Sequence, residues 1–430
     1  MYAAIADELR KLRPVSEFTR VSSVWQGRIR LAPMPLPPEL GSEVTLRNTP
    51  IGLVSAVTEQ GIEVALLGSA PPELVPGARV ILRPARRALG GSHWIGRIVD
   101  PDGAPLDGRP ILRLSEQAEN TDVSTAMASR GLGARLTTGV LAIDTLLPLA
   151  LGQRLGLFAG SGIGKSTLLA EMAKTREADV VVYALIGERG RDLRTFVTEA
   201  LDADARARSI VIAATSDRPP HLRVGCLEVA VRTAELLRDQ GKQVLLLVDS
   251  ITRFAEAEQE IRAVSGGVTG GYGLPAGFPA RLARLCERIG PGAGEAGDIT
   301  AVLSVLVSGG DMDEPVADLL RGLFDGHVVL SREIAERGRF PAIDVTRSVS
   351  RSLPDVATAV EADLIAKARR LISAYDEAQL LVRSGLYVAG GDPVLDAAVA
   401  RHDRIEEALS RSGMDSVEAS FAVLRSALGG

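Results

Sequence analysis

The sequence predicts an α/β protein with a parallel-sheet core, a small β-barrel before the core and a helical domain after it. Apolar runs that recur between helical stretches predict buried parallel strands, at residues 180–185, 210–214, 244–248 and 299–307. Short β-runs with Gly and Pro turns precede them, between residues 18 and 87, a pattern typical of a small closed barrel. After Pro354 the apolar residues follow a helical period. We therefore expect an arm at 1–15, a barrel at 16–90, a core at 91–352 and a helical domain at 353–430.

The stretch LGLFAGSGIGKST, residues 155–167, predicts a phosphate-binding loop between a buried strand and a helix. Its glycines let successive backbone N–H groups point at one anion, and the positive end of the helix dipole adds to the attraction. We expect the Lys165 ammonium to reach the β- and γ-phosphates of a nucleotide and the Ser166 hydroxyl to bind Mg²⁺. Ala159 replaces the first Gly of the usual pattern and fits if its φ is negative. The candidate nucleotide-binding residues of the loop are Gly160, Ser161, Gly162, Ile163, Gly164, Lys165, Ser166 and Thr167.

Two carboxylates follow predicted strands, at the edge of a parallel sheet where ligands bind. Asp249 ends the run at 244–248, the usual place of the carboxylate that holds Mg²⁺ in phosphate-loop enzymes. Glu188 follows the run at 180–185 and could polarise the water that attacks a phosphate. A lone Glu after a strand is more often a loop residue or a helix cap, but the order of the motifs here favours the catalytic role.

Composition limits the class of protein. The chain has 430 residues, of which 46% are hydrophobic, so we expect a globular protein of two or three domains. Its two cysteines and four histidines show no ligand spacing, which argues against a metal cluster or a disulfide framework. No apolar run is long enough to span a membrane and no signal-peptide core is present, which predicts a cytoplasmic protein. A formal charge of −5 argues weakly against a nucleic-acid partner.

The first 14 residues place Ile5, Leu9 and Leu12 on one side of a possible helix. A partner-binding helix and a lightly docked terminus explain this pattern equally well, because terminal segments are often disordered on their own. The choice stays open at the level of the sequence.

Seven motifs, spread over nearly the whole chain, resemble the hexameric ATPases of flagellar and type III protein export, which are relatives of the α and β subunits of rotary ATP synthases. The resemblance implies a RecA-like core, and Ala at the position of Ala159 is familiar in this family. The motifs are GRIVDPDGAPLDG, TGVLAIDTLLPLALGQRLGLFAGSGIGKST, IGERGRDL, RDQGKQVLLLVDSITRFAEAEQEI, DEPVADLLRGLFDGHVVLSR, FPAIDVTRSVSR and SGLYVAGGDPVLDAAV.

The resemblance also implies roles for particular residues. Glu188 matches the family's catalytic glutamate, Arg189 its phosphate-side neighbour and Asp249 its magnesium-ordering aspartate. Phe340 matches the aromatic residue that packs on adenine. Arg351 matches an arginine finger that reaches into the neighbouring subunit's site, and its planar guanidinium suits a phosphoryl transition state. Without the motifs, Arg351 would be interpreted as a surface salt-bridge residue and Phe340 as part of the core.

One loop departs from the family pattern. Residues 266–278, GGVTGGYGLPAGF, keep the Gly271–Tyr272 pair but lack the Gly-Glu-Pro-Pro segment that normally precedes it. In the related rotary enzymes this loop faces the central bore of the hexamer. The departure leaves the loop's role open and does not touch the catalytic residues.

The resemblance implies an Mg²⁺-dependent ATP hydrolase that works as a homohexamer and energises the unfolding and export of proteins. The implied partners are an export regulator at the N-terminal arm, a central stalk-like protein in the bore, export substrates with their chaperones, and a membrane export gate to which the protein is peripheral. No nucleic-acid partner is expected.

Three other functions compete with this one. A rotary ATP synthase subunit is the nearest, but a phosphate loop, a catalytic Glu and the SVSR arginine in one chain suit a homo-oligomer. A Rho-type RNA translocase would need basic and aromatic residues interleaved on the barrel, which offers Phe18 and Trp25 with scattered charge. A non-catalytic nucleotide-binding scaffold would not need Glu188.

Overall fold

The computed structural model forms two compact units. The first comprises the described part of Met1–Ala88 with Pro219–Leu222 and Glu256–Phe278, and the second comprises the rest. The predicted arm and most of the loop at 266–278 lie outside the described residues. Within the described chain, no helix is both long and apolar enough to cross a membrane. The described residues are 18–25, 27–38, 41–47, 49–67, 70–83, 90–111, 130–264, 274, 277–307 and 314–429.

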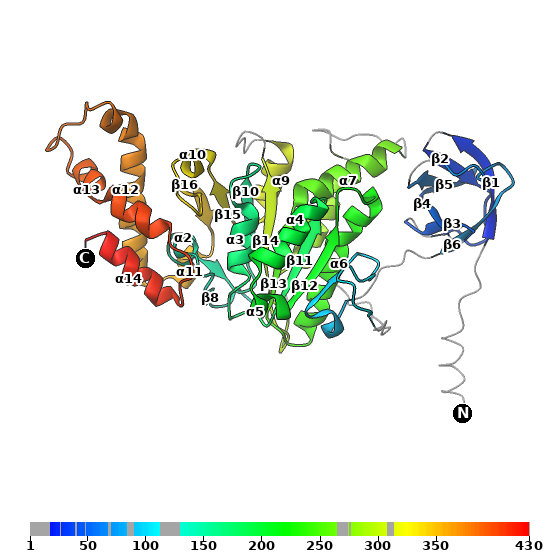
Figure 1. The fold of residues 1–430 in the computed structure, drawn as a ribbon, viewed down its shortest axis with the longest axis horizontal. Coiled ribbons are helices and arrows are strands. Elements are labelled where there is room, and N and C mark those ends of the chain that lie inside the picture. The colour runs from blue at the N-terminus through cyan, green and yellow to red at the C-terminus, as the bar shows by residue number, and fades with distance from the viewer. Residues whose placement is uncertain are drawn as a thin grey trace. The chain divides into compact units, whose positions relative to one another are not determined.

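Six antiparallel strands close the barrel of the first unit, in the order β1-β2-β5-β4-β3-β6 (Figure 1). Alternate side chains such as Val21, Ile29 and Val64 are buried inside it. A tight turn before Gly61 joins β4 to β5, and a Cβ on Gly61 would lie only 2.3 Å from the Leu31 carbonyl oxygen. The strands are β1 Phe18–Trp25, β2 Arg28–Leu31, β3 Glu43–Leu46, β4 Thr49–Thr58, β5 Gly61–Leu66 and β6 Arg79–Arg83.

The second unit contains an eight-stranded sheet in the order β16-β15-β10-β14-β13-β11-β12-β7. Among these strands only β16 runs antiparallel to its neighbour. Every residue of β11, β12 and β13 is buried, which explains their continuous apolar sequences. The predicted strands are confirmed as β11 to β14. The strands are β7 Arg97–Val99, β10 Arg154–Ala159, β11 Val180–Ile186, β12 Ser209–Ala214, β13 Val244–Asp249, β14 Ile299–Leu306, β15 Gly326–Leu330 and β16 Ile343–Ser350, with a separate pair β8 Arg135–Leu136 and β9 Leu149–Ala150.

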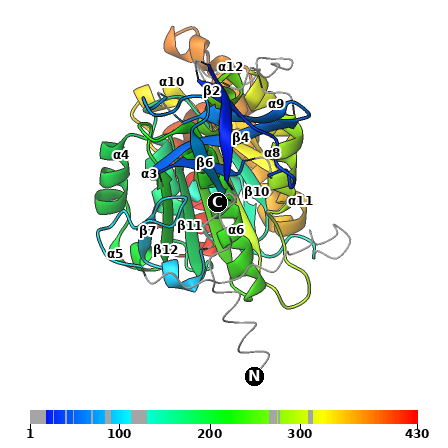
Figure 2. The same ribbon diagram turned by 90° about the vertical axis from the view of Figure 1, so that its right-hand side faces the viewer.

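Helices lie on both faces of this sheet (Figures 1 and 2). The helical stretch that begins with α4 is not one regular α-helix, because a π-helical turn, Phe196–Ala200, follows α4 directly. The wider turn buries two successive side chains, Phe196 and Val197, and the Phe196 ring packs edge-on against Tyr183. The helices are η1 Ser92–Trp94, α2 Leu141–Leu146, α3 Lys165–Met172, α4 Gly190–Thr195, α5 Ala203–Ala207, α6 Pro220–Asp239, α7 Ile251–Val264, α8 Phe278–Glu287, α9 Pro315–Leu323 and α10 Arg332–Glu336.

The chain after Arg351 is helical, as predicted, and packs on the sheet unit. Side chains of α12, α13 and α14 share one hydrophobic core with α2 and the sheet. Thr358 and Glu361 form a capping box that starts α12, and the Asp392 carboxylate accepts from two backbone N–H groups at the start of α13. The four helices are α11 Leu353–Val356, α12 Ala359–Arg383, α13 Pro393–Leu409 and α14 Val417–Ala427.

Candidate active site

The order of the strands brings the separate motifs to one edge of the sheet. The phosphate loop follows β10, Asp249 ends β13, and Glu188 follows β11. These three strands are parallel, with β14 between β10 and β13, and β11 next to β13. The carboxyl ends of parallel strands meet at one edge, so that residues 84 positions apart in the chain, such as Lys165 and Asp249, come into contact.

The phosphate loop has the backbone that its glycines predict. Gly162 and Gly164 adopt φ values of 79° and 88°, and Gly164 caps the start of α3. Ala159 is not among the described residues with positive φ, so the alanine fits without strain. The buried side chain of Ile163 anchors the loop, and Arg332 on α10 donates through Nη2 to the Ser161 carbonyl at 3.2 Å. The loop is therefore held in place from the core and from α10.

Asp249 is the centre of a buried polar cluster. Its Oδ1 pairs with the Lys165 ammonium and accepts from the Ser304 hydroxyl at 3.0 Å, while its Oδ2 accepts from the Ser166 hydroxyl at 3.2 Å. Asp249 is 2% exposed and Lys165 is 8% exposed, so each charge depends on the other for compensation. The ammonium is thus held at the mouth of the phosphate loop.

Glu188 lies beside this cluster, with its Oε1 4.0 Å from Lys165 Nζ. Burial raises the pKa of its carboxyl group, and the negative charge of Asp249 raises this pKa further. Lys165 and Arg253 oppose the rise. Arg253 packs against Gly187, the residue before Glu188: a Cβ added to Gly187 would lie 3.1 Å from the Cβ of Arg253. A partly desolvated carboxylate at this position suits a base that takes a proton from water.

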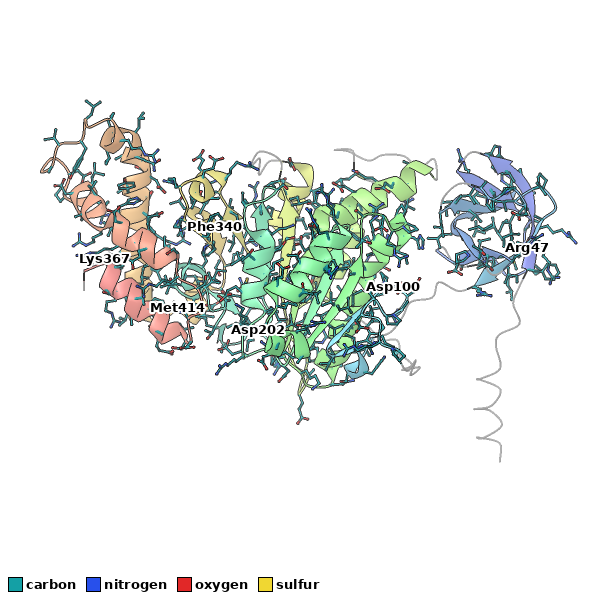
Figure 3. All side chains as sticks on the ribbon, viewed as in Figure 1. Arg47, Asp100, Asp202, Phe340, Lys367 and Met414 are labelled. Atoms are coloured by element: carbon teal, nitrogen blue, oxygen red, sulfur yellow. The ribbon has the colours of Figure 1, made fainter. Side chains whose placement is uncertain are left out.

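Phe340 lies next to the phosphate loop, at Gly164. It precedes β16, and a Cβ on Gly164 would lie 3.6 Å from its ring. Phe340 is 51% exposed, so its ring is not part of the core and offers an aromatic face next to the loop. Figure 3 labels its place in the fold.

Arg351 is not brought to this site within the chain. Ser350 pairs with Gly326, whereas Ala159 pairs with Leu330 at the other end of β15. The register therefore separates Arg351 from the phosphate loop by at least about 13 Å along the strands. Arg351 is exposed, and its backbone N–H donates to the Asp325 carbonyl at 3.0 Å.

The remaining predicted residues lie at the rim of the site. Arg189 follows Glu188 directly and is exposed, as are Ser161 and Thr167 around the loop. Their side chains are accessible to a ligand that approaches the carboxyl edge of the sheet.

Three residues of the site received no role from the sequence: Ser304, Arg253 and Arg332. Ser304 is the one hydroxyl residue in the apolar run VLSVLV, and a single polar residue inside a buried strand indicates a polar partner nearby. Arg253 follows Asp249 by four residues, so the sequence alone places it near the end of that strand. The contact of Arg332 with the loop depends on the pairing of β15 with β10, which no local pattern indicates.

The polar cluster fits Mg²⁺. Carboxylate and hydroxyl oxygens are ligands that this ion accepts, directly or through water, and the Ser166 and Asp249 oxygens lie side by side. When bound there, the ion would neutralise phosphate charge.

Comparison with known proteins gives matches over most of the chain. Residues 139–350 match the nucleotide-binding domain of the ATP synthase alpha/beta family, and residues 357–425 match the T3SS EscN ATPase C-terminal domain. A flagellum-specific ATP synthase of Caulobacter vibrioides is 42% identical over 361 residues, covering 81% of each chain.

Solved structures match a larger part of the chain than this relative does. The assembled ATPase EscN of the enteropathogenic E. coli type III secretion system superposes with a TM-score of 0.85 at 31% identity, covering 95% of this chain and 100% of the other. EscN in complex with its central stalk EscO gives 0.82 at 32% identity, with the same coverage. The resemblance found in the motifs is confirmed, and the chain belongs to the family of flagellar and type III secretion ATPases.

Proposed function

We propose that the chain hydrolyses ATP with Mg²⁺ at the carboxyl edge of its sheet, as a homohexamer, and that this hydrolysis energises protein export. The observation that carries the proposal is the cluster of Lys165, Ser166 and Asp249 at the phosphate loop, with Glu188 4.0 Å from the ammonium. A binding module would need the loop alone. The nearby carboxylate with a raised pKa is the feature that favours turnover.

Each residue has a separate task in this proposal. The loop amides and Lys165 bind the phosphates, and Ser166 with Asp249 holds Mg²⁺. Glu188 orients the attacking water and receives its proton, while Arg189 and Thr167 line the approach. Phe340 packs on the adenine ring, far from the reacting atoms, and so contributes to binding rather than to the chemical step.

Arg351 is proposed to act in the site of a neighbouring subunit. Arg351 lies at the edge of the sheet opposite the loop, too far away to serve the phosphate loop of its own chain. This position supports the proposal. Hydrolysis would then depend on assembly, which agrees with a homohexamer.

The pathway and partners are proposed from the relatives. One similar structure holds EscN with a central stalk, EscO, which favours a stalk-like protein in the bore here. We further propose a cytoplasmic protein at the inner-membrane export apparatus that receives export substrates with their chaperones. A rotary ATP synthase subunit remains the alternative, since residues 139–350 match that family too.

Replacing Lys165 by Ala in the chromosomal gene distinguishes an export ATPase from a subunit of a rotary ATP synthase. We expect secreted export substrates to fall to background in the culture medium, with normal growth on a carbon source that requires oxidative phosphorylation. The control is Lys174→Ala, which replaces an exposed lysine two residues after the end of α3 that pairs with Glu171. Normal export with lost respiratory growth would favour the synthase instead.

The regulator at the N-terminal arm is a further proposal, carried by the apolar stripe Ile5, Leu9 and Leu12. Removal of residues 1–14 is expected to spare basal ATPase activity and to abolish capture of the regulator in a pulldown. Capture at the level of the full chain would return this segment to the role of a docked terminus.

A further inference from the structure

A buried arginine outside the site described above precedes Phe340 directly. The Arg339 side chain is 8% exposed, and burial lowers the pKa of its guanidinium. The charge of Glu406 on α13 is the strongest nearby charge that opposes this effect, and its Oε2 lies 3.0 Å from Arg339 Nε. Asp344 and Asp376 contribute weaker attractions, and Arg337 a repulsion. Glu406 is therefore the main counter-ion of Arg339.

The same guanidinium closes the turn that presents Phe340. Arg339 Nη2 donates to the Ile343 carbonyl at 2.9 Å, so the side chain bridges the two ends of the segment 339–343. Arg339 Nη1 and Nε are both buried without a hydrogen-bond partner among the described residues, so the contact between Nε and Glu406 is an ion pair and not a hydrogen bond. With two of its contacts made by Ile343 and Glu406, the guanidinium has little other support in its place.

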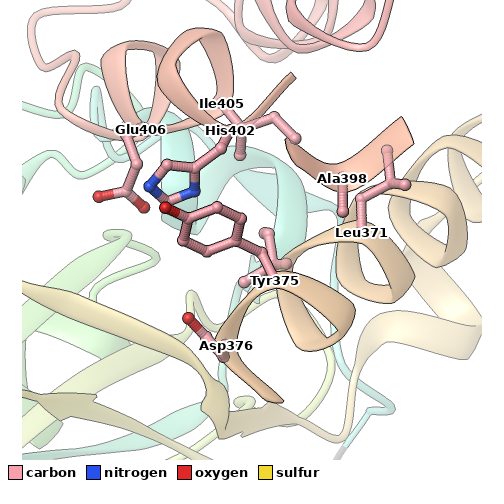
Figure 4. Close-up of a pocket in the computed structure, with 8 residues that line it drawn as sticks. Leu371, Tyr375, Asp376, Ala398, His402, Ile405 and Glu406 are labelled. Atoms are coloured by element: carbon pink, nitrogen blue, oxygen red, sulfur yellow. The ribbon is translucent and has the colours of Figure 1, made fainter. Parts of the chain in front are cut away.

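Glu406 is held on a well-anchored part of α13. Its neighbour Ile405 is buried, and His402, one turn earlier, stacks on Tyr375 of α12 with ring centroids 3.5 Å apart (Figure 4). The pocket drawn there is lined by residues of both helices, including Glu406. The carboxylate is thus positioned by the packing of α13 on α12 and not by the phosphate loop.

We propose that Glu406 is a positioning residue for nucleotide binding: through Arg339 it fixes the turn that holds Phe340 beside the phosphate loop, so the packing of α13 sets the affinity for the nucleotide base. This inference rests on the proposed role of Phe340. Because Phe340 is remote from the reacting phosphates, loss of the pair changes binding and leaves the chemical step nearly unchanged.

The test combines Glu406→Gln, which removes the charge and keeps the shape, with Phe340→Ala. Glu406→Gln is expected to raise both the KM for ATP and the calorimetric Kd for Mg²⁺–ADP by roughly fivefold, with kcat nearly unchanged. In the Phe340→Ala background the same substitution should change neither constant, because the two residues act through one contact. The matched control is Glu407→Gln, which removes an exposed carboxylate from the next position of α13 and should have no effect.

The outcomes separate this inference from the proposed function. If Phe340→Ala leaves the Kd for Mg²⁺–ADP unchanged, the adenine role of Phe340 is wrong, and the inference falls with it. If Phe340→Ala weakens binding but Glu406→Gln does not, only the positioning role is overturned. An equal effect of Glu406→Gln with and without the Phe340 ring also overturns it, since the carboxylate would then act by another route. A lowered Tm with unchanged Kd and KM would assign the pair to stability alone.

Discussion

Glu188→Gln is expected to bind ATP with nearly the affinity of the unchanged chain and to lose most of its turnover, by on the order of 10²- to 10⁴-fold. The substitution keeps the shape of the side chain and removes the group that receives the proton from water. The carboxylate lies 4.0 Å from the Lys165 ammonium, so its loss leaves the phosphate contacts in place. The measurement is the Kd for ATP by calorimetry together with steady-state phosphate release.

Lys165→Ala is the variant with which Glu188→Gln is compared, because it should lose ATP binding as well as hydrolysis. It removes a phosphate contact and also leaves the buried Asp249 carboxylate without its cation. We expect weaker ATP binding as well as lost hydrolysis, in contrast to Glu188→Gln. Turnover of Glu188→Gln at the normal rate would end the assignment of Glu188 as the base.

The pH profile provides an independent check on Glu188. Burial, followed by the charge of Asp249, raises the pKa of its carboxyl group, so it takes up a proton at a higher pH than an ordinary glutamate does. The base is therefore lost as the pH falls through this raised pKa, and the rate should fall on that side. The residual rate of Glu188→Gln should lack this acid limb.

Much of the fold and site could be predicted because the signals are local. The apolar runs of the central strands are continuous because those strands are buried on both faces. The glycines of the phosphate loop mark positions with positive φ, and Asp249 follows its strand directly. Such features depend on a few neighbouring residues, so the sequence alone indicates them.

The features that could not be predicted depend on contacts between distant segments. Arg332 reaches the loop across 171 positions of the chain. From the sequence, Glu406 and Arg339 are indistinguishable from ordinary solvent-facing residues. They form an ion pair only because α13 packs against the turn before β16. The pairing of β16 with β15, which decides where Arg351 lies, is likewise invisible to local patterns.

Arg351→Ala is expected to lower turnover by on the order of 10³-fold or more, by analogy with other arginine fingers. The register places Arg351 at the sheet edge opposite its own phosphate loop, and we propose that its guanidinium serves another subunit. The unchanged chain should therefore show a specific activity that rises with protein concentration as subunits associate.

Arg351→Ala should flatten this rise while the mass of the assembly, measured by light scattering, stays the same. The control is Arg347→Ala, which replaces an arginine of β16 four residues before the finger. Full activity of Arg351→Ala would assign the residue to the surface, as its exposure alone suggests.

The most direct test of a site shared between subunits mixes Lys165→Ala with Arg351→Ala protein, each inactive alone. Interfaces that pair an intact phosphate loop with an intact finger should form in mixed assemblies, and hydrolysis should recover to a fraction of the normal rate that depends on the mixing ratio. If mixed subunits assemble together and remain inactive at every ratio, Arg351 does not complete a neighbour's site, and the shared site is wrong.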